Sequence, residues 1–283
     1  MNKSEYQERI ADYYLQTQNA YKDSWKLDEA LSIHYGYKDS KAKTFTASLF
    51  RMNEVMAEFA QIKKEEKVLD AGCGVGGSSV FLATNLNCRC IGITLSDVQL
   101  VQDKKNAEKR TLQHLCSFEL QDYCHTNFAD DSFDIVWGLE SICYAEKKED
   151  FIKEAFRSLK PGGRLIFADG MVTQFENNDH PTIRKWLDGW AVNYLETPER
   201  FKTMLVDVGF KNIQYKNITP YVKHSSVRLR NYAVAATIYG IWLKIPGKNR
   251  WTKVQYGNIS AAWYQYFGLK KNLWSYGMFS AEK

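Results

Sequence analysis

The residues best suited to ligand chemistry follow a short apolar run near the start of the second quarter of the chain. Val68 and Leu69 end in Asp70, as expected of a buried strand, and four glycines then lie between positions 72 and 77, before a helical pattern begins at Ser78. Glycine permits positive φ and lets a ligand touch the main chain, and a helix N-terminus adds unpaired N–H groups. The stretch therefore predicts a socket shaped for a nucleotide or nucleoside.

The glycine spacing by itself leaves two kinds of ligand open. It fits the GxGxxG fingerprint of dinucleotide sites, so a nicotinamide-dependent oxidoreductase is one hypothesis. However, the negative carboxylate of Asp70 is not expected to bind a phosphate, whereas it can bind the ammonium group of an amino acid. The next expected strand, Arg89–Ile93, ends at Thr94, where a dinucleotide site normally has an acid for the ribose. A nucleoside that carries an amino acid is therefore favoured.

Glu140 is the second residue that suggests chemistry. It follows the expected strand Phe133–Leu139 and lies among apolar neighbours. A carboxylate is unfavourable to bury without a purpose or a partner. Such a group can stabilise a cation or accept a proton, whereas the alternative is that it caps or pairs with the next helix.

The composition narrows the class of protein. The 283 residues are 45% hydrophobic, enough for one large α/β domain with a cap, and the net charge of +5 does not suggest nucleic-acid binding. The six cysteines show neither CxxC spacing nor a matching His pattern, so we expect free thiols and no metal site. The sequence shows neither a signal peptide nor an apolar run long enough to span a membrane, which predicts a cytoplasmic protein. A homo-oligomer stays open.

Strands and helices alternate through the middle of the chain, which predicts a parallel sheet covered by helices on both faces. Further strands are expected at 117–120, 164–168, 210–218 and 274–281, and helices at 46–60, 96 onward, 151–159, 183–194 and 198–208. Ser96 to Gln99 has the form of a capping box, and Lys160 to Gly163 reads as the turn that ends a helix.

The two ends of the chain differ from this middle part in amino-acid composition and periodicity. Residues 1–45 are polar and aromatic with a poor helical period, so only short helices are expected there. Residues 221–283 hold thirteen aromatic residues interleaved with basic ones. We read 1–60 as a helical lid, 61–220 as the core, 221–270 as an aromatic helical cap and 271–283 as the final core strand. The basic residues are expected to form a solvated face, with contact to a diphosphate or an anionic membrane as the alternatives.

Several motifs in order resemble one protein family. VLDAGCGVGGSS, GITLSDVQ, DDSFDIVWGLES and LKPGGRLIFAD follow each other at suitable separations, and HYGY precedes them at 34–37. Together they resemble class I S-adenosylmethionine-dependent methyltransferases, in the group that methylates tocopherols, sterols and prenyl diphosphates and cyclopropanates mycolic acids. The resemblance spans about residues 34–170. It implies a doubly wound, Rossmann-like sheet of seven strands with the last strand antiparallel, S-adenosylmethionine as cofactor and S-adenosylhomocysteine as product.

The resemblance also implies roles for individual residues. It assigns Asp70, Gly72, Cys73 and Gly74 to the methionine part of the cofactor, Thr94, Leu95 and Gln99 to the ribose and adenine, Asp122 and Tyr123 to the adenine, and Leu139 to the region near the sulfonium. Each has a simpler alternative. Asp70 would then only cap the end of a strand, and Asp122 would be a turn residue. Gln99 would be a member of the capping box, and Thr94 and Leu95 would be packing residues. The family more commonly has an acid where Thr94 stands.

For the methyl acceptor, three residues are the candidate catalytic groups: Glu140, Tyr35 and Tyr144. Glu140 would stabilise a cation or act as base, and Tyr35 would fold over the cofactor with its hydroxyl near the methyl, or else only pack in the lid. His34 is expected to be a surface or packing residue. The aromatic cap suggests a small lipophilic acceptor, and C-methylation of a prenyl diphosphate or sterol-like isoprenoid is the first hypothesis. O- or N-methylation of a phenol, quinol, sugar or amine is the alternative, and a non-catalytic cofactor-binding protein is a third.

Overall fold

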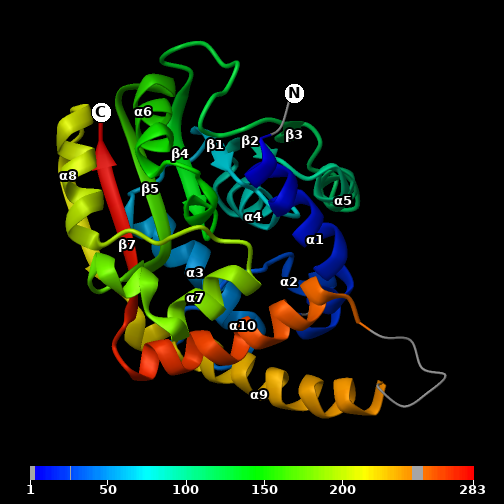
Figure 1. The fold of residues 1–283 in the computed structure, drawn as a ribbon. Helices are drawn as coiled ribbons and strands as arrows, with labels where there is room; N and C mark the ends of the chain where they lie inside the picture. The colour runs from blue at the N-terminus through cyan, green and yellow to red at the C-terminus, as the bar shows by residue number, and fades with distance from the viewer. Residues whose placement is uncertain (1–3, 26, 244–250) are drawn as a thin grey trace.

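The computed structural model describes residues 4–25, 27–243 and 251–283, which build a seven-stranded sheet with helices on both faces (Figure 1). The strand order is β3-β2-β1-β4-β5-β7-β6, and β7 runs antiparallel to both of its neighbours. The strands are β1 Lys67–Ala71, β2 Arg89–Thr94, β3 Cys116–Leu120, β4 Phe133–Leu139, β5 Leu159–Val172, β6 Lys211–Asn217 and β7 Trp274–Glu282. The predicted α/β fold class, with its antiparallel last strand, is confirmed.

The register of the parallel strands brings their carboxyl ends to one edge of the sheet. Asp70 near the end of β1 pairs with Gly92 on β2 and with Trp137 on β4. Residues that directly follow these strands therefore lie near one another, which is where ligands bind in open α/β sheets.

Successive residues of each strand point to opposite layers. Val68 and Ile166 belong to a core with the first helical layer, whereas their neighbours Leu69 and Phe167 belong to a core with the second. The first layer contains α3 Phe45–Phe59, α4 Gly77–Leu86 and α5 Asp97–Glu108, and the second contains α6 Lys148–Ser158 and α8 Pro198–Val208. Both faces of the sheet are thus buried, as a doubly wound fold requires.

The N-terminal segment differs from the short helices that were expected. It forms one long helix, α1 Glu5–Ser24, followed by the single turn α2 Leu27–Ala30. Ser4 and Gln7 cap α1 reciprocally. Its buried residues recur every three or four positions: Tyr6, Ile10, Tyr13, Thr17 and Tyr21. Because most of this stripe is tyrosine and threonine, its hydrophobic period is weak in the sequence.

Three helices from the C-terminal part of the chain form a cap on the first face of the sheet. It contains α7 Pro181–Gly189, α9 Thr219–Leu243 and α10 Lys253–Lys270, and Figure 1 shows α9 and α10 side by side. The helix expected at 183–194 begins earlier, because Pro181 occupies its first turn, and ends at Gly189, just before Ala191 takes a positive φ of 56°. The division of the chain into lid, core and cap stays a prediction, and α3, within the range read as lid, packs on the sheet.

Strand β5 is longer than the expected 164–168 at both ends. Leu159 already pairs with Phe133, so the Lys160 to Gly163 stretch continues the strand rather than only ending a helix. Gly162 N donates to the main-chain oxygen of Lys283 at 3.0 Å, and Val172 pairs with Trp274. The antiparallel partner β7 thus extends β5, a tertiary effect that a local pattern does not contain.

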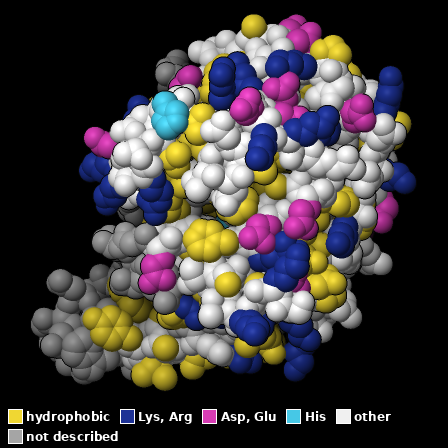
Figure 2. Space-filling model, turned by 180° about the vertical axis from the view of Figure 1, so that it is seen from behind, with side chains coloured by type: hydrophobic (Ala, Val, Ile, Leu, Met, Phe, Trp, Pro, Cys, Tyr) yellow, Lys and Arg dark blue, Asp and Glu magenta, His cyan; other side chains and the backbone are white. Residues whose placement is uncertain are grey.

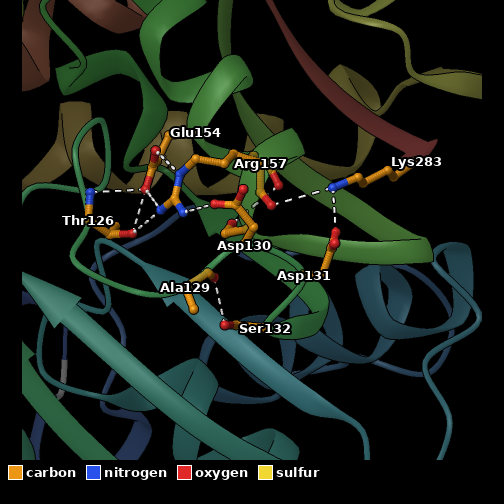
Figure 3. Close-up of polar contacts among 10 residues, drawn as sticks. Thr126, Ala129, Asp130, Asp131, Ser132, Glu154, Arg157 and Lys283 are labelled. Atoms are coloured by element: carbon orange, nitrogen blue, oxygen red, sulfur yellow. Dashed lines mark hydrogen bonds and ion pairs between the residues drawn. The ribbon is translucent and has the colours of Figure 1, made fainter.

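The turn before β4 is held by a cluster of ion pairs (Figure 3). Arg157 on α6 contacts Asp130 at 2.5 Å and Glu154 at 2.6 Å, and Lys283 at the C-terminus contacts Asp131 at 2.7 Å. This cluster lies at the amino end of β4, the opposite edge of the sheet from the strand ends that form the site. We therefore read it as a structural clamp between the turn, α6 and the C-terminus.

All six cysteines are free; five are buried and Cys143 is partly exposed. Within the described ranges there is no group of three or more His, Cys, Asp or Glu side chains placed to hold a metal ion. No described helix combines the length and apolar character needed to cross a membrane.

Candidate active site

The turn after β1 requires its glycines. Gly72 and Gly74 have φ of 84° and 58°. A Cβ at Gly72 would lie 2.4 Å from the Cβ of Ser141, whereas a Cβ at Gly74 would project into open space within 4 Å of no other atom. The main-chain N–H groups of Gly72 and Cys73 both donate to the oxygen of Ile93 at 3.0 Å. The turn is thus fixed to β2, and at Gly74 it presents bare backbone to the cleft.

Asp70 at the end of β1 is buried and faces this cleft. Its Oδ2 accepts from Ser79 N at 3.1 Å and from Ser79 Oγ at 2.7 Å, so the carboxylate does brace the first turn of α4. Neither bond uses Oδ1. Burial raises the pKa of Asp70 to about 6, although the two Ser79 hydrogen bonds oppose that rise. Asp70 and Leu139 line the same part of the cleft.

The residues after β2 interact with each other. Thr94 Oγ1 donates to Gln99 Oε1 at 3.0 Å. Ser96 caps α5 by accepting from Gln99 N, but the Gln99 side chain turns to Thr94 rather than back to the Ser96 main chain. Only half of the expected capping box therefore forms. Thr94, Leu95 and Gln99 all line the cleft.

The residues after β3 are divided between the cleft and the lid. Asp122 Oδ2 accepts from Gln7 Nε2 on α1 at 2.7 Å, and its Oδ1 accepts from Cys124 N at 2.8 Å. The bond from Cys124 N is the kind that a turn residue makes, which is the simpler alternative for Asp122. Tyr123 lines the cleft, and its hydroxyl donates to the main-chain oxygen of Ser141 at 2.6 Å. Gln7 thus holds one oxygen of Asp122, whose expected role at the adenine stays a prediction.

A histidine that sequence reasoning set aside also faces the cleft. His34 is 6% exposed, so it is not a surface residue. Its Nδ1 lies 3.0 Å from the main-chain oxygen of Tyr35, while its buried Nε2 has no hydrogen-bond partner. Burial lowers the pKa of His34 to about 4, so the ring is neutral at pH 7. With Nδ1 protonated towards Tyr35, Nε2 is an acceptor without a donor, and His34 lines the same part of the cleft as Asp70 and Gly74.

Glu140 directly follows β4 and adopts a strained backbone, with φ of 51°. Its main-chain N–H donates to Ala168 on β5 at 2.9 Å. Its Oε1 accepts from the main-chain N–H of Tyr35 at 2.5 Å and from the hydroxyl of Tyr276 at 2.6 Å. Burial nevertheless raises the pKa of Glu140 to about 8. The side chain is a partly buried carboxyl group in a fixed orientation, and its pKa lies well above the ordinary value for Glu.

A cavity of about 460 Å³ lies between the strand ends, α1 and the cap. Its walls are largely aromatic: Tyr14, Tyr21, Trp25, Tyr35, Tyr144, Trp186, Trp190, Tyr232, Trp251, Trp274 and Tyr276. Glu140, Tyr14 and Tyr144 line both this cavity and the cleft. Among its described lining residues the only charged side chains are Glu140 and Asp169, and neither Lys, Arg nor His is present. Glu140 therefore lies where the apolar cavity and the cleft meet.

The two candidate tyrosines have different surroundings. Tyr35 lines the cavity, but its hydroxyl donates to Gln265 on α10 at 2.8 Å, and only its main-chain N–H reaches Glu140. Tyr144 lies in a short 3-10 turn, and its hydroxyl donates to the main-chain oxygen of Trp190 at 3.1 Å. Both hydroxyls thus hold elements together, and the catalytic roles of these residues stay predictions.

A buried lysine supports the segment that carries Glu140. Lys148 at the start of α6 donates from Nζ to the main-chain oxygens of Cys143 and Ala145, each at 2.8 Å, and burial lowers its pKa to about 8. Asp169 on β5 accepts from Cys143 N at 2.9 Å. The segment that follows β4 is therefore held from both sides.

Comparison with known proteins identifies this arrangement. Residues 69–167, which contain the glycine turn and Glu140, match the model of a family described as a methyltransferase domain. The chain contains a class I S-adenosylmethionine-dependent methyltransferase domain. This confirms the family that the motifs resembled, and the dinucleotide alternative receives no support.

The methyltransferase domain has relatives with different acceptors. It is 36% identical to the chloroplastic tocopherol O-methyltransferase of Arabidopsis thaliana, over 56% of this chain and 47% of that protein. It is 31% identical to a sterol 24-C-methyltransferase of Saccharomyces cerevisiae, over 64% of this chain and 46% of that protein. The chain thus spans about half the length of the curated relatives that it matches.

Solved structures with the same fold cover nearly the whole chain. The cyclase SpnF superposes with a TM-score of 0.81 at 20% identity, covering 98% of this chain and 96% of that one. A geranyl diphosphate C-methyltransferase from Streptomyces coelicolor, in complex with Mg²⁺, geranyl diphosphate and S-adenosylhomocysteine, gives a TM-score of 0.76 at 18% identity, covering 99% and 98%. At this identity the likeness shows the fold alone.

The residues around the methyltransferase cleft fit S-adenosylmethionine. Bare backbone at Gly74, a buried carboxylate at Asp70 and the unpartnered Nε2 of His34 lie together, and they would meet the amino-acid part of the cofactor or its ribose hydroxyls. When bound, the cofactor supplies an electrophilic methyl group on a sulfonium. The fit agrees with the cofactor that the motifs implied.

Sequence reasoning missed Tyr276, which holds Glu140, as well as His34. Tyr276 lies on the last strand, far from every motif, so no local signal singles it out. For His34 a signal existed, because it belongs to HYGY; its burial and its lone unpaired nitrogen are visible only in the fold.

Proposed function

We propose that the whole chain transfers the methyl group of S-adenosylmethionine to a small lipophilic acceptor that carries no phosphate, with Glu140 as cation stabiliser or base. The observation that carries this proposal is the position of Glu140, which lines both the cofactor cleft and the 460 Å³ aromatic cavity. A group at that junction can act on the atom that receives the methyl, provided the two ligands fill the two spaces.

The charges of the cavity support an uncharged or cationic acceptor. A diphosphate is usually held by Arg, Lys or a bound metal ion, because its charge must be compensated when it leaves water. The described lining residues offer two carboxyl groups and no cation. Within the first hypothesis of isoprenoid C-methylation, the cavity therefore favours a sterol-like acceptor over a prenyl diphosphate.

Glu140 and the aromatic walls suit the chemistry of an alkene acceptor. When a carbon–carbon double bond takes the methyl group, the C–S bond breaks, a C–C bond forms and a carbocation remains on the acceptor. Glu140 in its ionised form and the faces of Trp and Tyr rings would stabilise that positive charge. Loss of a proton from the neighbouring carbon to Glu140 then restores a double bond, which balances the step.

O-methylation of a phenol or quinol is the second candidate. It is favoured by the pKa of about 8 for Glu140, which suits a base that takes the proton of a phenolic hydroxyl. The similarity to a tocopherol O-methyltransferase points to the same class of acceptor.

One assay separates these candidates. The protein is incubated with S-adenosylmethionine bearing an isotopically labelled methyl and a panel of sterols, quinols, phenols, amines and geranyl diphosphate, and the products are analysed by mass spectrometry. We expect label on carbon of a phosphate-free isoprenoid, whereas a labelled methoxy product would support the second candidate. Turnover of geranyl diphosphate alone would contradict the proposed acceptor class.

The role of Glu140 has its own test, the first of our predictions. Glu140→Gln keeps an oxygen that accepts from Tyr35 and Tyr276 but removes the negative charge. We expect kcat to fall about 10²-fold or more, as for loss of an acid–base group, with unchanged affinity for S-adenosylhomocysteine by calorimetry. Glu108→Gln, exposed on α5, is the matched control. If Glu140→Gln turns over at the wild-type rate, Glu140 is not catalytic.

A further inference from the structure

The cap exposes an uncharged helical surface that the proposed transfer reaction does not explain. We propose that α9 is a docking surface for anionic lipid bilayers, which seats the mouth of the acceptor cavity on a membrane surface. The occupant is a bilayer with negatively charged headgroups. The proposal concerns binding, and it holds or fails whatever acceptor is methylated.

The first observation is the concentration of exposed apolar side chains on one helix. Tyr232, Val234, Ile238 and Tyr239 are 40%, 41%, 66% and 51% exposed, all within eight residues of α9. They are four of the ten large hydrophobic side chains exposed in the described parts of the chain, and Trp263 on α10 is a fifth. Residues 231–239 contain no charge. Figure 2, which is turned by 180° from Figure 1, shows several hydrophobic side chains at the lower left, the side on which α9 then ends.

The second observation is the charge around this surface. Residues 208–281 contain eleven Lys or Arg and not one Asp or Glu, so the remainder of the chain carries a net charge of −6. Lys223, Arg228 and Arg230 lie on α9 within three turns before the apolar run, and Lys253 begins α10. Apolar side chains flanked only by basic residues are the composition of helices that lie on anionic membranes. An ordinary solvated face would mix both signs of charge.

The third observation is that the same helix walls the acceptor cavity. Leu229, Tyr232, Ala233 and Ala236 of α9 line the cavity together with Trp190 and Trp274. Tyr232 is also one of the exposed side chains, and Tyr239 lies on the same side of α9, whereas at about 100° per residue Val234 and Ile238 project from the opposite side of the helix. A membrane surface that contacts α9 would therefore lie against a helix that also walls the acceptor cavity.

Vesicle flotation tests this proposal on the full chain. Vesicles of phosphatidylcholine are compared with vesicles that also contain about 30% phosphatidylglycerol, at low and high salt. We expect binding to the anionic vesicles that weakens as salt rises, because Lys and Arg near a surface each contribute about 1 kcal/mol and are screened by salt. Absence of binding to anionic vesicles at low salt overturns the proposal.

Two pairs of variants locate the contact. Val234→Ser with Ile238→Ser should lower the partition coefficient about tenfold, whereas Val206→Ser, on α8 and 57% exposed, should leave it within about twofold. Lys223→Glu should also weaken binding, and Lys202→Glu, exposed on α8, should not. Calorimetric binding of S-adenosylhomocysteine shows that each variant is folded.

A second copy of the chain is the competing occupant. Light scattering after size exclusion measures the mass of the wild type and of the Val234→Ser, Ile238→Ser variant. If the variant changes the oligomeric state and vesicle binding stays as in the wild type, α9 is a self-association surface and the membrane proposal is overturned. If vesicle binding falls while the mass is unchanged, the proposal stands.

Discussion

At the scale of single residues, Glu140 combines three unusual properties. Its pKa is raised to about 8, its backbone has a positive φ that costs about 1–3 kcal/mol for a residue other than glycine, and its Oε1 accepts two short hydrogen bonds. Such strain persists only where neighbouring structure imposes it. The bond from Tyr276, on a strand more than a hundred residues away in the chain, is part of that structure.

The raised pKa of Glu140 predicts a pH dependence of stability. The group has a pKa of about 8 in the fold and an ordinary value of 4.5, so folding favours the protonated form. Its contribution to the free energy of unfolding is fully present below about pH 4.5 and is lost as pH rises through 8. Glu140→Gln cannot lose a proton, so it should gain several kcal/mol relative to wild type between pH 5 and 8.

Denaturant unfolding of both proteins across this pH range measures the difference. Asp169, whose pKa is also raised, is present in both proteins, and its charge is one cause of the raised pKa of Glu140. Glu108→Gln should follow the wild type at every pH. A constant difference between Glu140→Gln and wild type would mean that Glu140 is already ionised in the fold.

The unpartnered Nε2 predicts that His34 contributes to cofactor binding. His34→Asn keeps a donor near the position of Nδ1 but removes the acceptor, and should weaken calorimetric binding of S-adenosylhomocysteine about 3- to 10-fold, the value of one hydrogen bond. His34→Gln places an amide oxygen near the position of Nε2 and should recover part of the loss. Equal affinity of all three proteins would leave His34 as a packing residue.

At the scale of elements, the cap depends on the close approach of α7 and α10. A Cβ at Gly189, the last residue of α7, would lie 2.3 Å from the main-chain oxygen of Gly257 on α10. A Cβ at Gly257 would meet Gly189 no closer than 3.5 Å. The two glycines face each other, but only one of them is sterically required.

These distances predict opposite outcomes for two similar substitutions. Gly189→Ala should lower stability by about 1–3 kcal/mol, because the helices must move apart. Gly257→Ala lies inside α10, where alanine favours helix by about 1 kcal/mol over glycine, so it should be neutral or slightly stabilising. Thermal unfolding compares the two variants, and equal melting temperatures would contradict the packing argument.

At the scale of the whole molecule, α1 closes the cofactor cleft. The cleft has two lobes of about 60 Å³ each, and α1 contributes Ile10 and Tyr14 to its wall while Gln7 holds Asp122. Neither lobe has room for a whole adenosyl amino acid. We therefore expect α1 to move away when the cofactor binds and to pack again on top of it.

Hydrogen exchange tests this movement. Saturating S-adenosylhomocysteine, at about 100 times its Kd, should stabilise the protein by about 2.7 kcal/mol and slow the exchange of α1 amides. The amides of α8, on the other face of the sheet, should slow only as far as global stability requires. Unchanged exchange in α1 would show that the helix is not a lid.

Much of the fold was predictable because its signals are local. The glycine turn, the alternation of apolar strands with helices and the ordered motifs each lie within a short stretch, and they predicted the sheet, its antiparallel last strand and the class of cofactor. Where a pattern depends on partners, prediction was weaker. The stripe on α1 is mostly polar-tipped tyrosine, and β5 is lengthened by pairing with β7.

The amino-acid sequence alone favoured a nucleoside with an amino-acid tail as the ligand of the turn after β1, because backbone freedom and a nearby carboxylate are properties of consecutive residues. Only the tertiary structure decided the surroundings of Glu140: the hydroxyl of Tyr276, the N–H of Tyr35 and a cavity without cations. The burial of a carboxyl group and its hydrogen-bond partners depend on segments far apart in the chain. They set the pKa of that group and the charge of the ligand that can bind beside it. A short sequence motif contains no information about these distant segments.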